Sequence, residues 1–76
     1  MAEQKLPKWF NGELYTHGDT VTNPFSGESY DLTPAELSMY DYIMGCVMLG
    51  NYDATFNKAT NWFRKENPEA YMLLLD

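Results

Sequence analysis

The chain has 76 residues, which suffice for one domain over residues 1–76, and its 11 acidic against 5 basic residues leave a net charge of −6. This balance argues against direct nucleic-acid binding, because phosphate contacts need clustered Lys and Arg. The single cysteine, Cys46, excludes an intrachain disulfide, and no apolar run resembles a membrane span or a signal peptide, so we expect a cytoplasmic protein with no membrane association.

The N-terminal segment is predicted to be a lead-in followed by turns. Residues 1–7 form a loose polar lead-in that ends at Pro7. Asn11-Gly12 lies between Trp9-Phe10 and Leu14-Tyr15, and an Asn-Gly pair readily supplies the two positive φ values of a tight hairpin turn. Because the flanking runs are so short, an irregular loop is the alternative.

The clearest strand signals follow, at Thr20–Asn23 and Glu28–Leu32. Gly27 can adopt the left-handed conformation that closes the turn between them. Tyr30 and Leu32 alternate with polar residues, which gives the second strand one apolar face. We therefore predict a short antiparallel β-hairpin, or a three-stranded meander, within about residues 9–32.

A helix over about residues 34–49 has the strongest start signals in the chain. Thr33 and Glu36 match a capping box, and Pro34 suits the first helical position. Leu32 and Leu37 have the spacing of a hydrophobic staple across this start. These three cues agree on where the helix begins.

The inner face of this helix follows from residue spacing. Gly45 costs about 1 kcal/mol relative to Ala, so we expect a neighbouring element that approaches it closely. Gly50 is placed to end the helix in a left-handed conformation. The steps of three and four along the helix predict a core stripe of Leu37, Tyr40, Ile43 or Met44, Val47 and Met48.

Two more helices are predicted after this one. The second spans about residues 54–66, is capped by Asn51 or Asp53, and has a buried stripe of Tyr52, Phe56, Ala59 and Phe63. Asn67 then caps a short helix over about residues 68–75. The fold class is therefore α+β, with the hairpin packed on two main helices plus a short C-terminal helix.

Candidate catalytic groups are few. His17 is the only histidine, and with Asp19 it could supply half of a catalytic dyad or simply belong to a solvated turn. No metal-binding or phosphate-binding sequence motif is present. We expect no enzymatic activity, no cofactor and no metal site, and a small enzyme or metal site around His17 is the alternative.

Charge and aromatic content point to a protein partner. Residues 9–57 hold seven acids and no Lys or Arg, which serves either solubility or the binding of a basic partner. The surplus aromatic side chains either anchor a partner or cover the core. We expect a small acidic protein-interaction module, compatible with a homodimer, whose candidate partner-binding residues are Trp9, Phe10, Glu28, Asp31, Glu36, Asp41 and Trp62.

Two stretches carry a resemblance. Asn23–Glu28 with Leu32–Glu36 and Tyr40-Asp41 is the first, and Asn61–Tyr71 is the second. Across residues 20–76 they resemble small uncharacterised proteins encoded by marine cyanophages of the T4-like type. The resemblance implies a phage accessory factor that acts on a host or phage protein in the bacterial cytoplasm. A minor structural or assembly component of the virion is the alternative, and no active site is implied.

Overall fold

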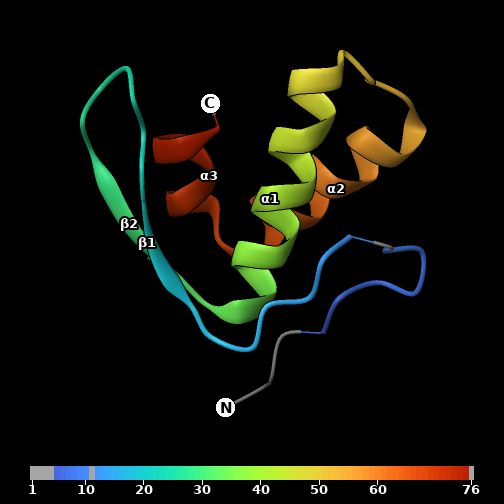
Figure 1. Cartoon of the computed structure of the whole chain (residues 1–76), viewed down its shortest axis with the longest axis horizontal. Coiled ribbons are helices and arrows are strands. Elements are labelled where there is room, and N and C mark those ends of the chain that lie inside the picture. The colour runs from blue at the N-terminus through green and yellow to red at the C-terminus, as the bar shows by residue number, and fades with distance from the viewer. Residues whose placement is uncertain (1–4, 11, 76) are drawn as a thin grey trace.

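In the computed structural model, which describes residues 5–10 and 12–75, the chain runs through a hairpin and then three helices. The elements are β1 (Asp19–Thr22), β2 (Ser29–Leu32), α1 (Pro34–Leu49), α2 (Ala54–Glu66) and α3 (Pro68–Leu74). Figure 1 shows α1 across the middle of the molecule, with the hairpin on one side, α2 on the other, and α3 between the hairpin and α1. The predicted α+β class with two main helices and a short C-terminal helix is confirmed.

The hairpin has the alternation that its sequence predicts. Its strands are antiparallel, from Asp19 opposite Leu32 to Thr22 opposite Ser29. Leu32 is buried and Tyr30 half-buried, whereas the polar residues of β2 are exposed. An isolated hairpin is marginal in water, so this apolar face needs the helices beneath it.

Two contacts fasten the hairpin to α3. The Asn23 Nδ2 group donates a hydrogen bond of 3.0 Å to the Leu73 carbonyl oxygen. The Tyr30 hydroxyl donates another, also 3.0 Å long, to the Glu69 carboxylate. The turn between the strands closes through Gly27, whose φ of 77° is the predicted left-handed conformation. The hairpin is therefore held at its turn as well as through its apolar face.

The start and end of α1 agree with the predicted signals. The Glu36 amide donates to Thr33 Oγ1 at 3.2 Å, and the Thr33 amide donates to Glu36 Oε1 at 3.1 Å. These two bonds form the predicted capping box. Gly50 ends the helix with a φ of 69°, and the Asn51 amide donates to the Cys46 carbonyl oxygen at 2.9 Å.

The predicted core stripe of α1 is wrong in its second half. Met39, Ile43 and Cys46 are buried, whereas Val47 is 40% exposed and Met48 85% exposed. The reason is that apolar side chains surround the C-terminal half of α1, so spacing alone does not define one inner face. Packing against α2 and α3 selects the face.

The close approach predicted at Gly45 is found at Gly18 instead. A Cβ atom added at Gly45 would meet nothing within 4 Å. A Cβ atom added at Gly18 would lie 2.1 Å from the Leu32 carbonyl oxygen. Gly18 therefore lets the chain pass directly against the end of β2, and Gly45 leaves open space beside α1.

The segment before the hairpin forms no strand at residues 5–10 and 12–18, so the three-stranded meander is wrong. The predicted Asn11-Gly12 turn includes Asn11, which lies outside the described residues, as do residues 1–4 of the lead-in. The Phe10 amide instead donates to the Pro7 carbonyl oxygen at 3.1 Å, and Leu6 packs on the core. The end of the lead-in is therefore part of the folded structure.

The helices meet around one core. Asp53 caps α2 and Asn67 caps α3, as predicted, through hydrogen bonds to the amides of Phe56 and Ala70. Tyr52 is 59% exposed, so its predicted place in the buried stripe of α2 is wrong. The buried apolar residues of the core cluster come from β2 and all three helices: Leu32, Met39, Ile43, Ala59, Phe63, Ala70 and Leu74.

Candidate functional site

Exposed apolar side chains gather at the C-terminal end of α1. Met48 is 85% exposed and Leu49 84% exposed, and they lie between Val47 and Tyr52. We name Val47, Met48, Leu49 and Tyr52 the α1-end patch. The remaining exposed large apolar side chains of the described part of the chain are spread over three other places: Leu14, Phe25 and Met72. Because apolar patches on monomers often mark interaction sites, this end of α1 is the candidate.

A pocket of about 300 Å³ lies beside the α1-end patch and shares Leu49 with it. Its wall on one side is α1, and on the other it is the segment that precedes β1. We name it the α1 pocket. Its lining combines two carboxylates, a phenol, a thiol and open backbone: Gly12, Glu13, Asp41, Tyr42, Gly45, Cys46, Leu49 and Asn51.

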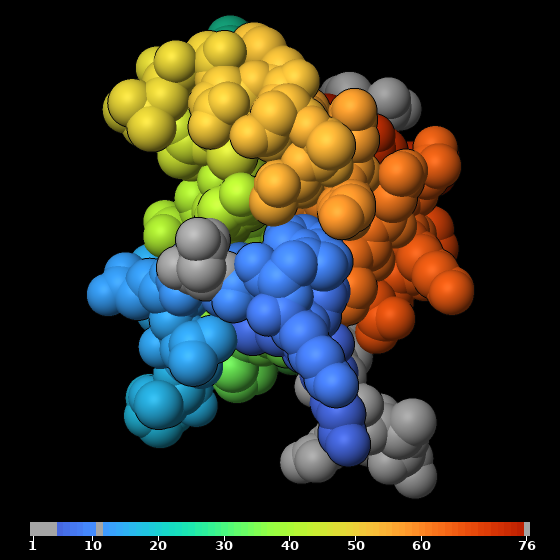
Figure 2. Space-filling model, turned by 90° about the vertical axis from the view of Figure 1, so that its right-hand side faces the viewer, coloured from blue at the N-terminus to red at the C-terminus, as the bar shows by residue number. Residues whose placement is uncertain are grey.

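Aromatic packing fixes the Tyr42 ring in this wall. The Phe10 ring meets it edge-on, with ring centroids 5.6 Å apart and planes at 60°. The Trp9 ring lies at a centroid distance of 6.4 Å. Figure 2 shows residues 5–10 in blue, packed between α2 in orange and the segment from residue 12 onward in lighter blue. Trp9 and Phe10 therefore hold the Tyr42 wall of the pocket in place.

One buried serine holds the other wall. Ser38 Oγ donates to the Pro34 carbonyl oxygen at 2.7 Å and accepts from the Tyr15 amide at 3.0 Å. The Tyr15–Ser38 bond fastens the segment that carries Glu13 to the first turns of α1. Sequence reasoning missed Ser38, because a serine inside a helix carries no signal for a bond across 23 residues.

The site is electrostatically negative. Desolvation first, and then the carboxylates of Asp41 and Glu13, raise the pKa of the Tyr15 phenol. Desolvation, the Cys46 thiol and the Asp53 carboxylate raise the pKa of the Tyr42 phenol. Three carboxylates therefore act on two phenols around the α1 pocket. The last turn of α1 has no basic residue to offset the negative end of its helix dipole.

The structure brings some predicted partner-binding residues together. Asp41 lines the α1 pocket, and Trp9 and Phe10 support it through Tyr42. Glu28 and Asp31 lie on the hairpin instead, where Asp31 is bonded across the strands to Thr20. The predicted acidic site is therefore divided between two separate places on the molecule.

Two other predicted residues take part in the packing of the fold. Glu36 is only 3% exposed, and its second carboxylate oxygen accepts a hydrogen bond of 3.1 Å from Asn67 Nδ2. Its role is to join the start of α1 to the α2–α3 junction. Trp62 is half-buried on α2 and packs against the core.

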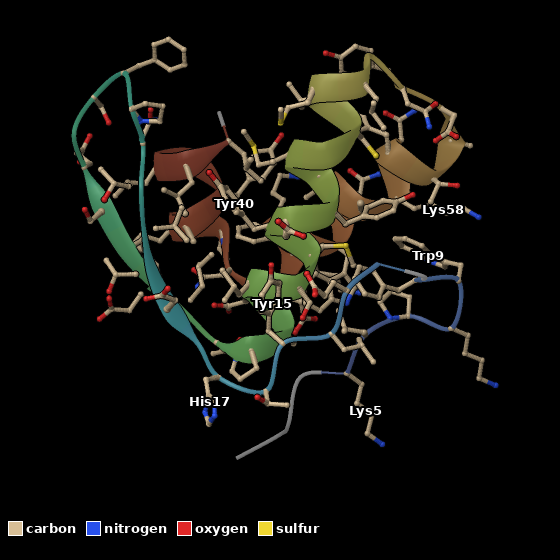
Figure 3. The ribbon with its side chains drawn as sticks, in the orientation of Figure 1. Lys5, Trp9, Tyr15, His17, Tyr40 and Lys58 are labelled. Atoms are coloured by element: carbon tan, nitrogen blue, oxygen red, sulfur yellow. The ribbon has the colours of Figure 1, made fainter. Side chains whose placement is uncertain are left out.

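The His17 region lies apart from this site. His17 is exposed, and Figure 3 shows it pointing away from the helices, whereas Trp9 faces them. Asp19 accepts a hydrogen bond from the neighbouring Thr20 amide at 2.8 Å. In the part of the chain that the structure describes, no three His, Cys, Asp or Glu side chains gather where they could hold a metal ion.

The α1-end patch itself was not predicted, because Val47 and Met48 were assigned to the core. The number of apolar residues near the end of α1 could have revealed it. Besides Gly45 and Cys46, five apolar residues lie between Tyr42 and Gly50, and one helix face cannot bury them all.

Of the helices described, none has the length and apolar character to span a membrane. No family model, curated protein or solved structure matches this chain.

Proposed function

We propose that this protein is a small interaction module without catalytic activity, and that the α1-end patch with the adjoining α1 pocket is its partner-binding surface. The observation that carries the proposal is the joint exposure of Met48 and Leu49 beside a pocket lined by carboxylates. Apolar anchors with a charged surround are the usual composition of a protein interface.

The charge layout favours a basic partner. Six of the seven acids in residues 9–57 are exposed, and Glu36 alone is buried. Glu13 and Asp41 line the α1 pocket, and the Asp53 carboxylate acts on Tyr42 in its wall, so a basic surface would approach with favourable steering. The hairpin acids add to the long-range field without adding contacts at the patch.

The resemblance to T4-like cyanophage proteins supports a host or phage protein as the partner, within the bacterial cytoplasm. Mass spectrometry of purified phage particles checks the alternative virion role. We expect the protein to be absent from particles, and its presence at a fixed copy number would indicate the structural role instead.

A comparative pull-down from cyanobacterial lysate tests the partner-binding surface. The Met48→Ser/Leu49→Ser double variant removes the two most exposed anchors of the patch. The matched control, Phe25→Ser/Met72→Ser, removes two exposed apolar side chains elsewhere. We expect at least one protein to be retained by wild type and control, and to be reduced at least tenfold by the patch variant. Circular dichroism verifies that all three proteins are folded.

If capture of every retained protein is equal for the patch variant and the control, the α1-end patch is not the binding surface and the proposal is wrong.

A further inference from the structure

We infer that the α1 pocket receives one Lys or Arg side chain of the protein partner, an inference that rests on the proposed function and specifies what its surface recognises. The cationic head would lie against the Glu13 and Asp41 carboxylates, which also act on the Tyr15 phenol. The methylene stem would lie along the Leu49 side of the pocket, continuous with the α1-end patch.

Charge complementarity is the first argument. The lining contains two carboxyl side chains, those of Glu13 and Asp41, and no Lys or Arg. A cation is therefore favoured over an anion or a neutral head.

The apolar part of the lining is the second argument. Leu49 presents an exposed aliphatic surface, and Gly45 presents bare backbone with no atom within 4 Å of where a Cβ would stand. Lys and Arg bury their methylene stems on such surfaces while their charged heads stay near water.

The volume of the α1 pocket and the scarcity of metal-ligating side chains limit which group can occupy it. At about 300 Å³ the pocket lies at the lower end of the range for small-molecule sites, roughly 300–1,000 Å³, and suits one long side chain. Among the residues that the structure describes, no group of three potential metal ligands is present, so a bare metal ion finds too few partners there.

Nuclear magnetic resonance titration of the full chain with two blocked tripeptides tests this inference. The probes are acetyl-Leu-Arg-Leu-amide and acetyl-Leu-Gln-Leu-amide, which differ only in the central charge. We expect the Arg peptide to shift the amide signals of Gly12, Gly45 and Asn51. We expect the Gln peptide to bind at least several-fold more weakly.

Matched variants assign the effect to the pocket. Glu13→Gln/Asp41→Asn should weaken binding of the Arg peptide about tenfold, since each exposed carboxylate contributes a modest part. Glu28→Gln/Asp31→Asn makes the same charge change on the hairpin and should leave the affinity unchanged within twofold. Gly45→Leu fills the pocket and should abolish the shifts.

Three results would overturn the inference: equal binding of the two peptides, equal weakening by both charge variants, or shifts that avoid the pocket. A dimer in sedimentation that disappears in Glu13→Gln/Asp41→Asn would also overturn it, because a second copy would then be the occupant. If one of these results is found while the pull-down still depends on the α1-end patch, only this inference is wrong. If the pull-down does not depend on the patch while the Arg peptide still binds the pocket as expected, the proposed function is wrong instead.

Discussion

At the scale of single residues, two glycines differ in what surrounds them. Gly45 has open space at its Cβ position, whereas Gly18 lies against the Leu32 carbonyl oxygen. Gly45→Ala should therefore stabilise the protein by about 0.5–1 kcal/mol through helix propensity. Gly18→Ala should destabilise it by about 1–3 kcal/mol, because backbone must move to admit the methyl group. Urea unfolding measures both, and changes of the same sign would contradict this reading.

Tyr30 should make stability depend on alkaline pH. Its hydrogen bond to Glu69 is the main cause that raises the pKa of the phenol above 10.0. The unfolded phenol thus loses its proton at lower pH than the folded one. The stabilisation is fully present below pH 10 and is lost as pH rises through the raised pKa.

Denaturant unfolding of wild type and Tyr30→Phe between pH 8 and pH 11 checks this. The difference in unfolding free energy should stay constant to about pH 9 and then shrink, because the variant lacks this phenol. If the difference in unfolding free energy stays constant from pH 8 to pH 11, the Tyr30–Glu69 hydrogen bond does not make stability depend on pH.

At the scale of elements, Glu36 joins three helices. It accepts from the Thr33 amide and from Asn67, whose own side-chain oxygen caps α3. Glu36→Ala should cost about 2–3 kcal/mol, because it removes a cap and leaves the half-buried Asn67 donor without this acceptor. Thr33→Ala should cost about 1 kcal/mol. Thermal unfolding compares them, and equal losses would mean that the Asn67 contact contributes nothing.

The helix boundaries were predictable because local chemistry sets them. Thr33, Pro34 and Gly50 act through backbone groups within a few residues, so the sequence contains all the information that places them. The inner face of α1 was not predictable in this way. It depends on which side meets Phe63 and the α2–α3 junction, and apolar residues on several sides of α1 leave that choice to tertiary packing.

The candidate site was predictable only in part for the same reason. Asp41 and the Trp9-Phe10 pair were identified from charge and aromatic content. The packing of Trp9 and Phe10 on Tyr42, and the Tyr15–Ser38 bond, join segments far apart in the sequence, which local patterns do not reveal. The prediction of Glu36 as a partner-binding residue did not allow for its burial. The neighbouring sequence reveals its capping role, but not its contact with Asn67, which lies 31 residues away.

At the scale of the whole molecule, a small core concentrates stability in few side chains. Phe63 is 0% exposed at the centre of the core, and Phe63→Ala should cost about 3–5 kcal/mol. Single cores of this size rarely supply more than about 3–5 kcal/mol, so the variant should be largely unfolded at 25 °C. Phe25→Ala is the matched control, because Phe25 is 97% exposed. A cooperative transition in the Phe63 variant would contradict the expectation.

The α1-end patch should also promote aggregation when the acidic charge of the chain is reduced. Two copies that meet through Met48 and Leu49 would hide apolar surface, and a net charge of −6 opposes that contact. As pH falls through the carboxylate range, roughly pH 5 to 4, this repulsion weakens. Light scattering should then rise for wild type and rise less for Met48→Ser/Leu49→Ser. Equal scattering would assign acid aggregation to another surface. The expected result would mean that the acidity of the chain keeps the proposed binding surface soluble.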